Sequence, residues 1–332
     1  MIKPLKLALV GAGTFGTRYI EALQTMPGVE LSWVCDISDE RRRAVAERFH
    51  LAHVADHFRE ACADDSVDAV IVVTPEAAHR EIAVSALDSG KHVIVEKPLA
   101  TSEEDGMAML QAAKRSGKLL MTGFLLRFDW RYAQLQQRLR QIGKVRNIYA
   151  YRNFDRGLFE LYSRTHSFIE NAIHDIDIIL WYVQSRAAKV HGFCRNTLGL
   201  PSPDINWGVI EFENGAIAVL QTSWLYPPQK YENVQFNAGV QVMGERGVLE
   251  LANDRGGFRA NLEGEGILLL DQTAWANIHD EPRGAFGAML RHFLACLRGE
   301  STYRGTLPEE AIESMRIACR LVADSQRLER SP

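Results

Sequence analysis

Three glycines near the N-terminus have a spacing that suits phosphate binding. They occur in the run Gly11-Ala12-Gly13-Thr14-Phe15-Gly16, between an apolar strand pattern and a helical pattern. Glycines at these positions permit a tight turn, a close approach of the backbone to a pyrophosphate, and close packing of helix on strand. The helix start adds free backbone N–H groups and the positive end of a dipole. The loop, with Thr14 and Phe15 opening the helix, therefore predicts a dinucleotide site.

An acidic residue supports the same prediction. Asp36 ends the second strand pattern, twenty residues after Gly16. A carboxylate there can accept hydrogen bonds from both hydroxyls of an adenosine ribose, whereas it repels a 2′-phosphate. The sequence therefore favours NAD over NADP as the cofactor. Arg41, Arg42 and Arg43 follow and could hold a 2′-phosphate instead, although a charge run at a helix start is typically a solvated face.

The elements that would position these groups alternate regularly through the first 123 residues. Short apolar runs at 5–10, 31–36, 69–74, 93–96 and 119–122 are separated by helix-length segments. Such runs are typical of buried parallel strands in a doubly wound sheet, where ligands bind beyond the carboxyl ends of the strands. We predict an α/β Rossmann domain over residues 1–123.

The pattern changes after residue 123. Helical patterns at 129–141, 171–182, 285–298 and 308–327 surround strand-like runs at 145–153, 207–213, 216–224 and 234–243. Turn signals such as Asn214-Gly215 join these runs, which favours antiparallel pairing. We predict that residues 124–332 form an α+β domain with a large, mostly antiparallel sheet.

Composition excludes several classes of partner. The 332 residues carry 38 basic and 42 acidic side chains, a balance too even for strong attraction to nucleic acid or an anionic membrane. We find neither an apolar run near the ~20 residues of a membrane-spanning helix nor a signal-peptide pattern. The five cysteines are scattered and are expected to be reduced thiols. We expect a cytoplasmic protein.

Further motifs follow the later strands of the first half. They are Thr74-Pro75 with His79, the block Gly90 to Pro98 that ends in Glu96-Lys97-Pro98, and, beyond it, Arg127-Phe128-Asp129 and His174-Asp175-Ile176-Asp177. With the glycine loop and Asp36, these motifs closely resemble those of the glucose-fructose oxidoreductase and inositol dehydrogenase family, Gfo/Idh/MocA. The resemblance runs through nearly the whole chain. It implies that the cofactor is also contacted by Thr74, Pro75, His79, Glu96 and Lys97.

The resemblance also implies an active site. Lys97 matches the lysine of the E-K-P motif, which contacts the substrate hydroxyl and the nicotinamide ribose, and His174 matches the catalytic histidine. Glu170 stands where many family members have an aspartate, and it would share one face with His174 if the segment is helical. Arg127 matches a position that often contacts substrate, although it could equally pair with a structural carboxylate.

These residue types suit hydride transfer. Removing a hydride from a carbinol carbon becomes favourable only as the hydroxyl proton leaves, and imidazole can accept a proton at neutral pH. Glu170, or secondly Asp177, would orient His174, while Lys97 would stabilise a developing alkoxide. The sequence leaves open which of Lys97 and His174 is the formal base. We expect hydride transfer between NAD(H) and a hydroxyl carbon of a sugar, inositol or related polyol.

Alternatives remain at this point. One is an NAD-dependent glycoside hydrolase that uses transient oxidation and elimination; another is a noncatalytic cofactor-binding regulator, which the presence of Lys97 and His174 disfavours. His174 with Asp175 and Asp177 offers too few ligands to predict a metal. Family members commonly associate through the broad sheet, which implies a homodimer or homotetramer.

Overall fold

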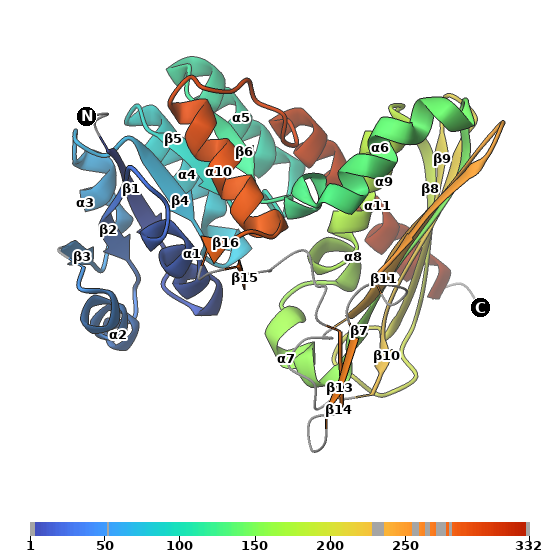
Figure 1. Cartoon of the computed structure of the whole chain (residues 1–332). Coiled ribbons are helices and arrows are strands. Elements are labelled where there is room, and N and C mark those ends of the chain that lie inside the picture. Colours follow the sequence, from blue (N-terminus) through green and yellow to red (C-terminus); the bar gives the residue numbers. More distant parts are fainter. Residues whose placement is uncertain are drawn as a thin grey trace. The chain divides into compact units, whose positions relative to one another are not determined.

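The chain folds as two compact units (Figure 1). The computed structural model describes residues 4–51, 53–227, 236–253, 259–262, 266–269, 277–278 and 281–329. Unit 1 comprises residues 1–125 and 277–312, and unit 2 comprises residues 126–276 and 313–332. The chain thus returns to unit 1 for residues 277–312, whereas the sequence patterns suggested one crossing after residue 123. Periodicity cannot reveal such a return, because it shows which face of a helix is apolar but not what covers it.

Unit 1 contains the predicted doubly wound sheet. Its six parallel strands lie in the order β3-β2-β1-β4-β5-β6. Their bounds are β1 Leu5–Val10, β2 Val29–Cys35, β3 His53–Ala55, β4 Ala69–Val72, β5 His92–Val95 and β6 Leu120–Thr122. The strands are largely buried and apolar, as expected where helices cover both faces. The α/β prediction is confirmed.

Two helices of unit 1 begin at capping serine residues. The helices of this unit are α1 Thr14–Gln24, α2 Asp39–Phe49, α3 Phe58–Ala63, α4 His79–Asp88, α5 Glu103–Ser116 and α10 Ala285–Leu297, with a short 3₁₀ turn η1 Glu76–Ala78. The Ser38 and Ser102 hydroxyls accept from the third backbone N–H after them, at the starts of α2 and α5. Phe286 of α10 meets the Tyr19 ring edge to face at 4.8 Å, which ties the returning segment to α1.

Unit 2 is built on a second six-stranded sheet of order β12-β11-β7-β10-β9-β8. The strands are β7 Val145–Asp155, β8 Ala187–Arg195, β9 Ile205–Phe212, β10 Ile217–Tyr226, β11 Phe236–Gly244 and β12 Val248–Ala252. Neighbours pair antiparallel except β7 and β10, which run parallel. The predicted mostly antiparallel sheet is confirmed.

Helices cover one face of this sheet. They are α6 Trp130–Ile142, α9 Ile173–Val183 and the later part of α11 Pro308–Glu329. A Cβ on Gly192 would lie 2.1 Å from the carbonyl oxygen of Leu321, so α11 approaches β8 more closely than any side chain would allow. Trp224 is fully buried between Phe154 and Phe159, and is therefore a core residue.

The smaller elements complete the description. They are the 3₁₀ turns η2 Leu125–Phe128 and η3 Arg156–Leu158, the short helices α7 Phe159–Tyr162 and α8 Ser167–Glu170, and the strand pairs β13 Arg259–Leu262 with β14 Gly266–Leu269 and β15 Asn277–Ile278 with β16 Glu281–Pro282. Among the described residues, we find no helix with the length and apolar character needed to cross a membrane.

Candidate active site

The glycine loop joins β1 to α1 in the way its spacing predicts. Gly11 has φ +103°, and a Cβ there would lie 2.4 Å from the carbonyl oxygen of Val73. A Cβ on Gly16 would lie 1.9 Å from the carbonyl oxygen of Gly11, so α1 packs directly on the loop. Gly13 differs, because the nearest atom to its missing Cβ is Arg41 Nη1 at 4.0 Å. Open space at Gly13 leaves room for a pyrophosphate to approach the backbone.

The start of α1 is available to an anion. Gly13 is its N-cap and provides no side-chain hydrogen bond, and the first turn, with Thr14 and Phe15, contains no acidic residue. The first N–H groups of a helix have no partner within the helix and carry the positive end of its dipole. The loop therefore fits the pyrophosphate of a dinucleotide.

Asp36 is held in place beside this loop. Its Oδ2 accepts a hydrogen bond from the backbone N–H of Ala12 at 2.7 Å, and its Oδ1 accepts one from the N–H of Ser38 at 2.8 Å. Each carboxylate oxygen has a second lone pair, which suits the two ribose hydroxyls of an adenosine. The carboxylate is nearly buried but fixed at the rim that the sequence predicted.

His79 connects the loops that follow β4 and β5. The side chain is buried, its Nδ1 lies 3.0 Å from the carbonyl oxygen of Pro98, and its Nε2 lies 2.9 Å from that of Thr74. Burial lowers the pKa of this imidazole. The side chain thus braces two loop backbones, one on each side. Of the other predicted cofactor residues here, Pro75 is exposed, and the Thr74 hydroxyl has no hydrogen-bond partner within the described residues.

Glu96 fixes the backbone of Lys97. One carboxylate oxygen, Oε1, accepts a hydrogen bond from the Tyr19 hydroxyl at 2.5 Å, and the other, Oε2, accepts one from the Lys97 N–H at 3.0 Å. Tyr19 is fully buried, and burial together with the Glu96 charge raises the pKa of its phenol. The Lys97-Pro98 peptide is cis. The sequence analysis missed Tyr19, since an aromatic residue on the buried face of α1 gives no local signal of a polar role.

The segment that carries His174 is broken into two helices. α8 ends at Glu170 and α9 begins at Ile173. The prediction that Glu170 and His174 share one face required a continuous helix, and the structure does not have one there. Glu170 is buried and accepts hydrogen bonds from Arg164 Nη2 at 3.2 Å and Thr165 Oγ1 at 3.3 Å. His174, the second residue of α9, is half-buried. Their catalytic roles remain predictions.

Two buried ion pairs hold the part of α9 that directly follows His174. Asp175 accepts from Arg152 Nε at 2.8 Å and Nη2 at 2.9 Å, while Asp177 accepts from Arg127 Nε at 3.0 Å and Nη2 at 2.8 Å. All four side chains are at most 4% exposed. Fork-to-fork pairs of this kind fix direction as well as distance. Arg127 therefore pairs with a structural carboxylate, which was one of the two roles that the sequence left open. Arg152 of β7 is a residue that the sequence analysis missed.

Asn171 is a third residue that the sequence analysis missed. It lies between α8 and α9 and is buried, and its Nδ2 has no hydrogen-bond partner among the residues described. A buried amide donor left unpaired in a protein calls for a bound partner or an ordered water. No motif marks it, because its significance comes from the break between the two helices.

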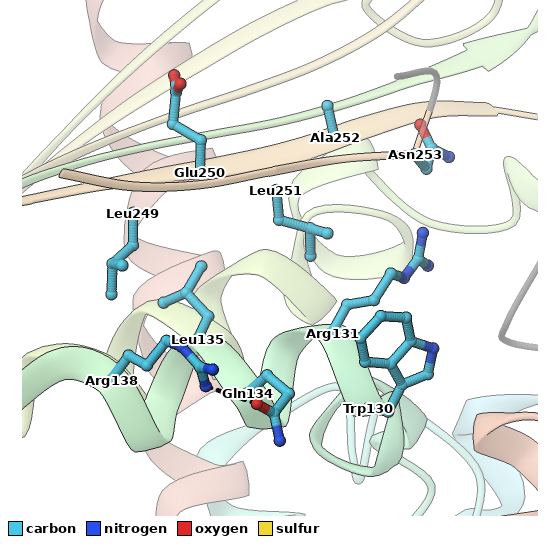
Figure 2. Close-up of a pocket in the computed structure, with 10 residues that line it drawn as sticks. All are labelled: Trp130, Arg131, Gln134, Leu135, Arg138, Leu249, Glu250, Leu251, Ala252 and Asn253. Atoms are coloured by element: carbon cyan, nitrogen blue, oxygen red, sulfur yellow. Dashed lines mark hydrogen bonds between the residues drawn. The ribbon is translucent and has the colours of Figure 1, made fainter. Parts of the chain in front are cut away.

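A separate pocket lies in unit 2 between α6 and the edge strand β12. Figure 2 shows Leu249 and Leu251 pointing toward α6, whereas Glu250 points away, as the alternation of a strand requires. None of the ten residues that line it is a predicted site residue; they are Trp130, Arg131, Gln134, Leu135, Arg138 and the five residues from Leu249 to Asn253. In the described parts of the chain we also find no group of three or more His, Cys, Asp or Glu residues suited to a metal ion.

Comparisons with known proteins find matches for both parts of the chain. Residues 5–124 match an oxidoreductase family with an NAD-binding Rossmann fold, and residues 132–250 match the GFO/IDH/MocA C-terminal domain. The chain is 28% identical over 256 residues to the inositol 2-dehydrogenase of Salmonella typhimurium, covering 74% of each protein. It is 28% identical over 313 residues to the scyllo-inositol 2-dehydrogenase (NAD(+)) of Bacillus subtilis, covering 90% of this chain and 87% of that protein.

A solved structure agrees on the fold. The scyllo-inositol dehydrogenase of Lactobacillus casei, with bound NAD(H) and scyllo-inositol, aligns over 98% of each chain with a TM-score of 0.82 at 20% identity. At that identity the likeness concerns the fold alone. The two family matches together cover most of the sequence, one on each side of residue 125. The chain therefore belongs to the GFO/IDH/MocA family of NAD-binding oxidoreductases.

Proposed function

We propose that this protein is an NAD-dependent dehydrogenase that oxidises a hydroxyl carbon of inositol or a related polyol or sugar. The observation that carries the proposal is the anchored Lys97, which follows β5 at the same edge of the parallel sheet as the glycine loop and Asp36. The relatives named inositol 2-dehydrogenase support the substrate class.

The proposed roles follow from the chemistry of each side chain. When bound, NAD supplies the acceptor for the hydride. Lys97 polarises the substrate oxygen and stabilises negative charge as its proton leaves, while a neutral imidazole nitrogen of His174 accepts the proton. The buried carboxylate of Glu170, held by Arg164 and Thr165, orients the imidazole and stabilises its cation.

Two further groups are proposed to contact substrate. Arg127, whose direction is set by Asp177, carries a planar fork of donors, a geometry suited to vicinal hydroxyls. Asn171 offers the buried amide donor described above. A site built to hydrogen-bond a hydroxyl rejects analogues that lack it, because its own buried groups would be left unpaired.

The test is a screen for NADH formation at 340 nm with NAD or NADP against inositols, aldoses and their oxidised forms. We expect turnover on an inositol or related polyol, and we expect Lys97→Ala to lower kcat by about 10²-fold or more while NADH still binds. Lys114→Ala is the control, since Lys114 is exposed and pairs with Glu309. NAD binding without net reduction on any compound would reject the dehydrogenase and favour the redox-elimination glycosidase or the regulator.

A pH profile separates the two candidate bases. If His174 is the base, kcat/KM of the wild type falls at acidic pH, where an imidazole is protonated, and His174→Asn removes this fall. A fall that persists in His174→Asn would reject His174 as the base and favour Lys97.

We also propose that the protein assembles as a homodimer or homotetramer through the sheet face opposite its helices. That face carries Trp207 and Phe193, which are cross-strand neighbours on β9 and β8 and are 37% and 48% exposed. Aromatic residues are enriched in protein interfaces relative to the rest of the surface. Light scattering should give more than one chain mass for the wild type and a single chain mass for Trp207→Asp.

The cytoplasm is the proposed location. All five cysteines are free thiols in the structure, which suits a reducing compartment. The substrate, a small polyol or sugar, is the proposed partner, with neither nucleic acid nor membrane.

A further inference from the structure

Three consecutive arginines lie near the start of α2, close in sequence to Asp36, and they have different partners in the structure. Arg42 donates from Nη1 to the carbonyl oxygen of Asp36 at 2.7 Å and from Nη2 to Asp39 at 3.1 Å. Arg43 is 79% exposed and pairs with the other oxygen of Asp39 at 2.6 Å. Both guanidinium groups are therefore directed to backbone or to Asp39.

Arg41 alone of the three reaches the carboxylate of Asp36. Its Nη1 lies 3.8 Å from Asp36 Oδ2, and the same nitrogen lies 4.0 Å from the Cβ position of Gly13. The start of α2 fixes the backbone of this residue, because the Arg41 N–H donates to the capping hydroxyl of Ser38. The side chain is 59% exposed, so its guanidinium can shift toward a ligand.

We infer that Arg41 determines how far the adenosine site tolerates the 2′-phosphate of NADP. Any group that hydrogen-bonds to Asp36 Oδ2 lies within reach of the Arg41 guanidinium. With NAD, Asp36 accepts from the ribose hydroxyls while Arg41 offsets its charge. With NADP, Asp36 repels the 2′-phosphate and Arg41 attracts it, since a guanidinium binds phosphate oxygens in a two-pronged geometry. The preference for NAD thus depends on the repulsion of the 2′-phosphate by Asp36 and its attraction by Arg41. Substituting either side chain should change the ratio of NADPH to NADH affinity.

The inference rests on the NAD site and not on the proposed polyol substrate. It is tested by the binding of NADH and NADPH to full-length protein, measured by the fluorescence of the nicotinamide or by calorimetry. Five variants are compared with the wild type: Arg41→Ala, Arg43→Ala, Asp36→Ser, and Asp36→Ser combined with each arginine substitution. Arg43→Ala is the matched control, because it removes the same charge from the same helix at a position directed to Asp39.

We expect Asp36→Ser to raise NADPH affinity by about tenfold relative to NADH, and Arg41→Ala in that background to remove the gain. The double variant with Arg43→Ala should keep the gain within about twofold, as expected for an exposed pair that does not contact ligand. In the wild-type background, Arg41→Ala should weaken NADPH binding more than NADH binding. This comparison tests the inference even if Asp36→Ser disturbs the loop. The NADPH gain should also shrink at high salt.

Two results would overturn the inference. In one, Arg41→Ala and Arg43→Ala weaken NADPH binding equally, which would indicate only a general effect of net charge. In the other, neither substitution changes the ratio of NADPH to NADH affinity. Failure of the wild type to bind either nucleotide would contradict the dinucleotide site itself, a different outcome from either of these.

Discussion

The two units position their functional groups by different means. In unit 1 the predicted cofactor groups are backbone N–H groups and side chains at the ends of parallel strands, and each motif is a short run of neighbouring residues. In unit 2 the His174 segment is held by two buried arginine–aspartate pairs whose partners are far apart in sequence. The difference shows why the predicted cofactor groups of unit 1 can be read from local motifs, whereas the pairs that hold the His174 segment of unit 2 require knowledge of long-range contacts.

The largest effect should come from breaking one of the unit 2 pairs. We expect Arg152→Met to lower the free energy of unfolding by about 3–5 kcal/mol, because it leaves the Asp175 carboxylate buried without its partner. Urea unfolding measures this. Arg115→Ala, which breaks an exposed pair with Asp88 in unit 1, should cost no more than about 1 kcal/mol. Equal losses for the two variants would contradict the distinction between the units.

A second test uses pH on the same segment. His166 caps α8, where its Nδ1 accepts from the N–H of Phe168, and burial lowers its pKa from 6.5 to about 4. On acidification, His166 is therefore protonated at a higher pH in the unfolded chain than in the folded protein. The stability that neutral His166 contributes is fully present above pH 6.5 and is lost as the pH falls toward 4, by up to about 3 kcal/mol.

The matched variant is His166→Asn, because asparagine can cap the same helix without titrating in this range. Melting temperatures of the two proteins are compared from pH 7 to pH 4. The other histidines are common to both, so the difference isolates His166. Parallel curves would show that its burial does not control the acid stability of this segment.

In unit 1 the most consequential side-chain bond is that of Tyr19. Tyr19→Phe leaves one oxygen of the Glu96 carboxylate without its donor, which should cost about 1.5–3 kcal/mol of stability. We also expect kcat to fall while the Kd for NADH changes little, because Glu96 positions the Lys97 backbone. Tyr149→Phe is the control, since that hydroxyl makes a longer, half-buried bond to Gln221. A loss of stability with unchanged kcat would show that Glu96 does not act through Lys97.

The variant with the smallest expected effect on folding stability tests whether the backbone of the glycine loop in unit 1 binds the cofactor. Gly13 has an ordinary φ of −71° and open space at its Cβ, so Gly13→Ala should leave the melting temperature nearly unchanged. It should weaken NADH binding by about tenfold or more, equivalent to about 1.4 kcal/mol, because the methyl group occupies the approach to the pyrophosphate. Gly16→Ala should instead destabilise the fold, since its Cβ would overlap the Gly11 carbonyl.

The sequence by itself determined the parts of this protein that depend on local geometry. The glycine loop, Asp36 and the alternation of strands and helices could be predicted because turn conformation, capping and periodicity are properties of neighbouring residues. The roles of Lys97, His174, Glu170 and Arg127 came from resemblance to a family, and their chemistry stays a prediction.

The tertiary structure decided what joins distant residues. It paired Tyr19 with Glu96 across 77 positions and Arg127 with Asp177 across 50, placed Arg41 alone of the three arginines near the Asp36 carboxylate, and put a helix break in the chain between Glu170 and His174. Each of these outcomes depends on which groups are buried together. A buried charge must find a partner wherever the fold supplies one, and that requirement leaves no pattern in the neighbouring sequence.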